Sequence, residues 1–201
     1  MTKNFSKAKL DRMFRLGYRL AFKTKPKKKD WDDIFSLWYC AAKGGHRRAQ
    51  FYLGTCYDLG LGSEKNFAEA YKWYLKAAKK EHRESQYNIG FFYREGEVVK
   101  QNYKKAVYWF SLAAALGDTE AQRDLGFSYF YGDGIKTDHT KAVYWYKKAA
   151  RKNDLKALYN LGLCYKHGDG VKQSNYLAKH YFEKARAFGH KKASTQLRNL
   201  T

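Results

Sequence analysis

The 201-residue sequence is poor in proline, cysteine and acidic side chains. Its single proline excludes a proline-rich linker protein, and its three cysteines form no CxxC or Cys/His cluster with metal-ligand spacing. We therefore expect Cys40, Cys56 and Cys164 to be reduced, partly buried thiols, and we expect no metal site. No apolar run approaches the ~20 residues of a membrane span, and residues 1–14 lack the apolar core of a signal peptide. These absences lead us to expect a cytoplasmic protein.

Acidic residues are scarce relative to basic ones, since 19 Asp and Glu stand against 40 Lys and Arg. The resulting net charge of +21 attracts acidic partners and leaves three candidates open: nucleic acid, an anionic membrane surface or an acidic protein. The excess is greatest in residues 1–30, which contain 11 basic and 2 acidic side chains. The run KPKKK at 25–29 resembles a minimal nuclear-import signal, although such runs are common in solvated loops. The aromatic content of 18% provides enough apolar area to exclude a disordered chain.

A period of 36 residues runs through the sequence. It relates glycines that follow Leu or Ile, a second set of glycines, and a set of aromatic residues. These sets are Gly54, Gly90, Gly126 and Gly162; Gly60, Gly96, Gly132 and Gly168; and Trp73, Trp109, Trp145 and Tyr181. So many positions sharing one period indicate tandem structural units.

Each unit is predicted to contain two helices. Ala49, Leu53 and Tyr57 form one apolar stripe of the first helix, which Gly60 ends. The second helix is expected to begin at a residue that can cap it, in successive units Asp30, Asn66, Asn102, Asp138 and Ser174. We expect Trp73, Tyr74 and their copies to fill the gap to the neighbouring unit. The turn between the helices contains glycine but lacks the GxxxxGK[ST] spacing of a P-loop.

This pattern resembles the Sel1-like repeat family, which is related to the tetratricopeptide repeats. The segments AQRDLGFSYFYGDGIKTDHTKAVYWYKKAA from Ala121 and ALYNLGLCYKHGDGVKQSNYLAKHYFEKA from Ala157 carry the resemblance. The unit from Ser85 has Val98 where the second turn glycine is expected, so we predict a differently shaped turn there. The resemblance implies an all-α, right-handed α/α solenoid of about five helix-turn-helix repeats followed by a capping helix.

We predict one domain over residues 1–201, divided according to the period. A degenerate, basic first repeat occupies 1–45, and a C-terminal capping helix occupies 190–201. The regular repeats are predicted at 46–81, 82–117, 118–153 and 154–189. A terminal helix with a polar outer face is what such an array requires.

No residue pattern indicates catalysis. The sequence contains no Ser/His/Asp arrangement, HExxH motif or nucleotide fingerprint. His46, His82 and His190 share one repeat position, but units stacked ~10 Å apart hold them too far apart to share one ion. We expect them at the starts of first helices, where other copies carry Asp118 and Asp154. The protein is therefore predicted to be non-enzymatic and to need no cofactor.

Binding residues are expected where the copies differ, because positions that serve the scaffold must be alike in every unit. Three variable series fall at i, i+4 and i+7 of the first helix, which the resemblance places on the concave side of the array. The predicted groove residues are Tyr52, Asn88, Phe92, Glu95, Asp124, Ser128, Tyr131, Asn160 and His167. Phe92 and Tyr131 would act as anchors, and the amides of Asn88 and Asn160 could bind a peptide backbone. The alternative is that some of these residues pack between units.

The resemblance implies a bacterial protein-interaction scaffold or adaptor. We expect a monomer that holds a peptide or a folded, acidic partner in its groove, in one version as an immunity protein that neutralises a toxin. The alternative is a nucleic-acid-binding accessory protein that uses its basic surface. That surface would include lysines on the second helices and a basic patch made of Lys23, Lys25, Lys27, Lys28 and Lys29.

Overall fold

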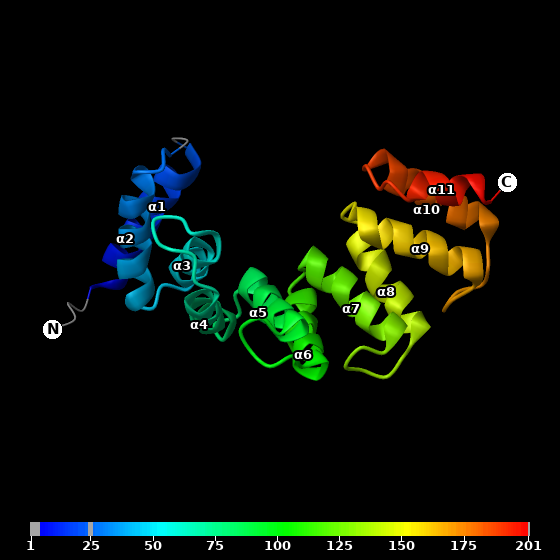
Figure 1. Cartoon of the computed structure of the whole chain (residues 1–201), viewed down its shortest axis with the longest axis horizontal. Coiled ribbons are helices and arrows are strands. Elements are labelled where there is room, and N and C mark those ends of the chain that lie inside the picture. The colour runs from blue at the N-terminus through cyan, green and yellow to red at the C-terminus, as the bar shows by residue number, and fades with distance from the viewer. Residues whose placement is uncertain (1–4, 24–25, 201) are drawn as a thin grey trace. The chain divides into compact units, whose positions relative to one another are not determined.

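The computed structural model describes residues 5–23 and 26–200, and helices are the only regular secondary structure in this part of the chain (Figure 1). The helices follow one another as α1 (Lys7–Lys23), α2 (Asp30–Lys43), α3 (Arg47–Leu59), α4 (Phe67–Ala78), α5 (Arg83–Glu95), α6 (Tyr103–Ala115), α7 (Thr119–Tyr131), α8 (His139–Ala150), α9 (Leu155–His167), α10 (Asn175–Ala187) and α11 (Ala193–Arg198). Five helix pairs followed by a short terminal helix confirm the predicted all-α, helix-turn-helix repeat architecture.

The contacts within the chain gather in two compact units, residues 1–100 and 101–201. The first unit contains α1 to α5 and the second contains α6 to α11. Within each unit every helix packs against the helix before it and the helix after it. This consecutive packing lets each repeat bury apolar faces that a single helix pair would leave in water.

The second helices begin at capping residues in four of the five predicted cases. The side chains of Asn66, Asn102, Asp138 and Ser174 each accept a hydrogen bond from the backbone N–H three residues later. The prediction is wrong for Asp30, because Lys29 is the N-cap of α2. The Asp30 carboxylate instead accepts a hydrogen bond of 2.7 Å from the backbone N–H of Lys27. The first helices α3, α5, α7 and α9 end, as predicted, at left-handed glycines.

Within a repeat, an aromatic ring of the second helix lies on a glycine of the first. A Cβ added to Gly54 would come within 2.6 Å of Cδ1 of Tyr74, and the ring of Tyr74 is 1% exposed. The same contact joins Gly126 to Tyr146. Tyr74 also reaches the neighbour, as predicted, since its ring centroid lies 6.4 Å from that of Phe92 in the following repeat. Trp73 reaches the other neighbour, since its ring centroid lies 6.3 Å from that of Tyr39 in the preceding repeat.

In three turns a second glycine lies against the preceding second helix. Gly62 has a φ of +66°, and a Cβ there would collide with the carbonyl oxygen of Trp31 at the start of α2. Gly134 and Gly170 have equivalent contacts with α6 and α8. In the described residues, Glu81 and Asn153 are the non-glycine residues with positive φ, so Val98 does not adopt the left-handed conformation. Its turn is differently shaped, as predicted.

Candidate functional site

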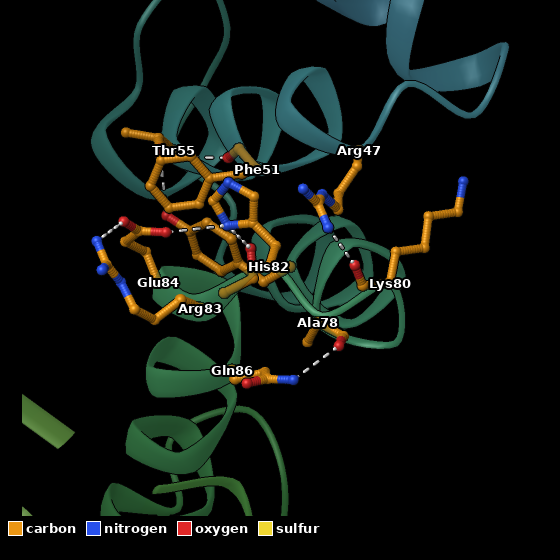
Figure 2. A network of polar contacts seen from close by, with 11 residues as sticks. Arg47, Phe51, Thr55, Ala78, Lys80, His82, Arg83, Glu84 and Gln86 are labelled. Atoms are coloured by element: carbon orange, nitrogen blue, oxygen red, sulfur yellow. Dashed lines mark hydrogen bonds and ion pairs between the residues drawn. The ribbon is translucent and has the colours of Figure 1, made fainter. Parts of the chain in front are cut away.

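The junctions between repeats contain the histidines that the sequence singles out. In the first unit, His82 is the N-cap of α5 and its ring stacks on Phe51 of the preceding repeat, with centroids 4.6 Å apart (Figure 2). The Nδ1 atom of His82 lies 3.2 Å from Oγ of Ser85. Burial, opposed by Glu84 and assisted by nearby arginines, lowers the pKa of His82 to about 4. This ring is therefore neutral at pH 7 and serves as a packing group.

Side chains bind backbone carbonyls at the end of α4 from two directions (Figure 2). Nε2 of Gln86, in the next repeat, donates to the carbonyl oxygen of Ala78 at 3.3 Å. Arg47, in the same repeat as α4, donates to the carbonyl oxygen of Lys80, just beyond the helix, at 3.0 Å. The last carbonyls of a helix lack donors within the helix. The Gln86 bond therefore fixes one repeat on the next, and the Arg47 bond ties α3 to the end of α4.

A histidine–aromatic stack recurs at this junction position in two other repeats, and an ion pair replaces it in a third. His46 stacks on Phe14, with centroids 4.7 Å apart, and His190 stacks on Tyr159 at 4.1 Å. In the second unit Arg123 replaces the aromatic residue and donates to Asp154 at 3.1 Å. The prediction of helix starts is confirmed for His46, His82, Asp118 and Asp154, which are N-caps. His190 precedes α11, whose N-cap is Lys192.

The cysteines show no reactive environment. All three are free, and Cys56 and Cys164 are buried. Burial raises the pKa of both buried thiols to about 12, so they stay protonated at neutral pH. Across residues 5–23 and 26–200, His, Cys, Asp and Glu do not gather in any group of three or more that could hold a metal ion.

Three of the predicted groove residues are buried, which corrects their placement on an open face. Phe92, Asp124 and Ser128 are 5%, 8% and 6% exposed. The Phe92 ring packs against Tyr71, with centroids 5.8 Å apart, and so stabilises the contact between α4 and α5. The reason is helix geometry: the position of Phe92 lies only about 60° around the helix from that of Ile89, which is the core stripe.

Three other predicted residues, Tyr52, Asn88 and Asn160, are half-buried. The ring of Tyr52 stacks on Trp38, with centroids 4.8 Å apart, within an aromatic cluster of α1 to α3. The side chain of Asn160 lies close enough to Tyr146 to influence the pKa of its hydroxyl. These contacts agree with the alternative that part of the predicted set packs between helices.

The remaining predicted residues, Glu95, Tyr131 and His167, are exposed at the ends of the first helices. Sequence reasoning missed their neighbours one turn earlier. Phe127 is 43% exposed and its ring centroid lies 4.4 Å from that of Tyr131, which is 62% exposed. Phe91, 37% exposed, occupies the equivalent position on α5. These positions lie about 200° around the helix from the core position of Leu125 and its copies. The sequence signal that could have identified them is a phenylalanine on the helix face opposite the core.

Basic residues are exposed on both units. Lys27, Lys28 and Lys29 are exposed, whereas Lys25 and the side chain of Lys23 lie outside the described residues. In the second unit, α6, α8 and α10 together contain eight Lys or Arg and one Glu. These three helices also expose Tyr108, Tyr144 and Tyr176, by 59%, 52% and 81%. The second helices of this unit thus form a basic surface with interspersed tyrosines.

None of the helices in the described ranges combines the length and the apolar character that crossing a membrane requires.

The Sel1 repeat model matches residues 47–82, 83–118, 119–154 and 155–189. No curated protein matches the chain. A Sel1 repeat protein from Oxalobacter formigenes is 32% identical with a TM-score of 0.83, over 94% of this chain and 76% of its own length.

Two further solved structures have the same fold. A protective antigen present in uropathogenic Escherichia coli strains is 32% identical with a TM-score of 0.88; the match covers 95% of this chain, which spans only 41% of that protein. An immunity protein from Pseudomonas aeruginosa is 24% identical with a TM-score of 0.55, over 92% of this chain and 67% of its own length. With four matched repeats and two relatives at 32% identity, this chain belongs to the Sel1 repeat family, whose members are protein-interaction scaffolds on a generally non-enzymatic fold.

Proposed function

We propose that this chain binds a protein partner through the exposed side of its first helices. The observation that supports this most strongly is the aromatic pair of Phe127 and Tyr131 on α7, which are 43% and 62% exposed on the same helix as the buried core residues Ala121 and Leu125. Aromatic side chains contribute large contact area at little entropic cost, and they dominate the energetics of interfaces. Phe91 on α5 offers a similar group in the first unit.

The charge of the chain favours an acidic partner. A net charge of +21 accelerates encounter with a negatively charged protein, and rigid helices lose little entropy on binding. Immunity proteins from Pseudomonas aeruginosa share the fold, so neutralisation of a toxin in the cytoplasm by a monomer of this chain is the specific role that we propose to test.

A photo-crosslinking experiment tests the binding face. Benzoylphenylalanine placed at position 127 should cross-link an acidic protein from the lysate of the native host, and this cross-link should survive treatment with nuclease. The same group at exposed position 144 should give no such cross-link. The captured protein is then purified and titrated calorimetrically. The double substitution Phe127→Ala with Tyr131→Ala should raise its Kd at least tenfold, while Tyr108→Ala with Tyr144→Ala should leave it within twofold. A larger effect from the second pair would contradict the proposal.

A second candidate function is nucleic-acid binding, which the surface of α6, α8 and α10 favours. Its eight basic residues could follow a phosphate backbone, and exposed Tyr108 and Tyr144 could stack on bases. Fluorescence anisotropy with a labelled 20-nucleotide single strand tests this at 50 and 200 mM salt. Support would be tight binding that weakens steeply with salt and falls at least fivefold in Tyr108→Ala with Tyr144→Ala. Weak binding that is insensitive to these tyrosines would exclude a dedicated nucleic-acid site.

A further inference from the structure

An apolar hollow opens between α1 and α2 at the N-terminal repeat. Met13, Leu16 and Leu20 of α1 line it together with Leu37 and Cys40 of α2. Leu16 is 36% exposed, although it holds the core position of its repeat. Exposed apolar surface that is continuous over two helices is typical of an interaction site.

The later repeats show what covers this hollow elsewhere in the array. The residues equivalent to Leu16 are at most 1% exposed, namely Leu53, Ile89, Leu125 and Leu161. In the repeats of Leu53, Ile89 and Leu125, the glutamine three residues earlier donates to a carbonyl near the end of the preceding second helix. These bonds join Gln50 to Ala42, Gln86 to Ala78 and Gln122 to Ala114. Met13 occupies the equivalent position, so the hollow is the place that a second helix occupies in every later repeat.

This equivalence defines the shape of an occupant. The second helices α2, α4, α6, α8 and α10 are 12 to 14 residues long. An occupant should therefore be a helix of similar length, about 18 Å for 12 residues, with one apolar stripe at i, i+3 or i+4, and i+7.

The surrounding charges define its chemistry. Three basic residues are exposed on the same side of α1 as Leu16. Lys9 and Arg12 lie seven and four residues before Leu16, and Arg19 lies three residues after it. The α2 side contributes one acidic lining residue, Asp33. Residues 1–50 contain 14 basic and 4 acidic side chains, so the region favours a negatively charged ligand.

A second copy of the chain fits these charges poorly. Its C-terminal residues 151–201, the part that would continue the array, contain 11 basic and 3 acidic side chains. Two basic ends would repel each other. A nucleic acid would satisfy the charges but would leave the apolar floor uncovered.

We propose that this hollow binds an amphipathic helix of a partner protein, with an apolar stripe in the hollow and Asp or Glu facing Lys9, Arg12 and Arg19. The proposal rests on the proposed scaffold function and gives the partner a second contact, separate from Phe127 and Tyr131.

A synthetic peptide provides the probe. It is a 14-residue helix with leucines at i, i+3, i+7 and i+10 and glutamates on its flanks, and the control peptide has lysines in their place. The chain contains only two methionines, Met1 and Met13, so methyl-labelled methionine gives a direct NMR reporter inside the hollow, assigned with Met13→Leu. The glutamate peptide should shift the Met13 signal in a saturable manner and protect Cys40 from alkylation.

Matched variants test the residues. Leu16→Asp should raise the Kd of the glutamate peptide at least tenfold, and Arg12→Glu with Arg19→Glu at least fivefold. Leu155→Asp, at an equally exposed leucine on α9, should change it less than twofold. Circular dichroism of each variant verifies that the helices are retained.

Four results would overturn the inference. The Met13 signal could stay unmoved by the glutamate peptide, or both peptides could bind equally. Sedimentation velocity could instead reveal a dimer that Leu16→Asp abolishes, which would assign the hollow to a second copy. If the captured partner binds Leu16→Asp with full affinity but loses binding on Phe127→Ala with Tyr131→Ala, the proposed function survives and the inference fails.

Discussion

Protonation of His82 should weaken the junction between its repeat and the preceding one. Burial lowers the pKa of His82 to about 4, whereas an unfolded histidine titrates near 6.5. A lowered pKa means that the unfolded chain binds the proton more tightly, so stability is full above pH ~6.5 and falls as the pH drops toward 4. With ~1.4 kcal/mol per pKa unit, the loss is about 2 kcal/mol at pH 5 and about 3 kcal/mol at pH 4.

The assay is urea denaturation at pH 7.5, 6, 5 and 4, compared between wild type and His82→Asn. Asparagine can still cap α5 but does not titrate. Carboxylates other than Glu84, which lies 3.4 Å from Nδ1 of His82, contribute alike in both proteins, so the difference between the two pH profiles reports on the His82–Glu84 pair. The stability of wild type relative to His82→Asn should fall by about 2 kcal/mol between pH 7.5 and 5.

A matched control is His180→Asn, because His180 is exposed on α10. This variant makes the same chemical change on the surface and is measured in the same series. If the profile of His82→Asn ran parallel to that of wild type, His82 would not be buried as a neutral ring, and the reasoning about this junction would be refuted.

Three further substitutions test the packing within and between repeats by urea denaturation. Gly126→Ala should lower the free energy of unfolding by about 1–2 kcal/mol, because its Cβ would lie 2.7 Å from Cδ1 of Tyr146; a gain in stability, as helix propensity alone predicts, would refute the ring-on-glycine contact. Glu81→Gly should raise stability by about 0.5–1 kcal/mol, because Glu81 holds a φ of +59° that glycine adopts without strain; an unchanged midpoint would contradict this. Arg123→Phe should lower the free energy of unfolding by about 3 kcal/mol, because it removes the cation bound to Asp154. Adding Asp154→His should recover part of this loss, because it restores an aromatic–histidine pair like that of Phe51 and His82. Strictly additive effects of the two substitutions would show that the ion pair and the aromatic–histidine pair are not interchangeable.

Much of the fold follows from the sequence because its determinants are local. Capping side chains such as Asn66 act within three residues, and Gly60 ends its helix through its own backbone conformation. Asp30 is the exception: its carboxylate binds a backbone N–H before the helix and leaves Lys29 as the cap. The 36-residue period predicts the repeats for the same reason, since each unit repeats the same local contacts.

The candidate site is less predictable because it depends on the direction in which each side chain points. Variation between copies indicated Phe92, but its position turns toward Tyr71 and into the interior. The exposed Phe127 lies on the opposite side of the helix and was missed for that reason. The 36-residue period does not reveal the hollow beside Leu16. Leu16 matches a core residue of every other repeat and differs from those residues only because no helix covers it.

Hydrogen–deuterium exchange of the complex with the captured partner tests the central claim most directly. The account predicts slower exchange in the C-terminal turn of α7, around Phe127 and Tyr131, and in α1 around Leu16. It predicts unchanged exchange in α6, α8 and α10. Protection confined to α6, α8 and α10 would contradict a binding face on the first helices and would favour the basic surface as the site.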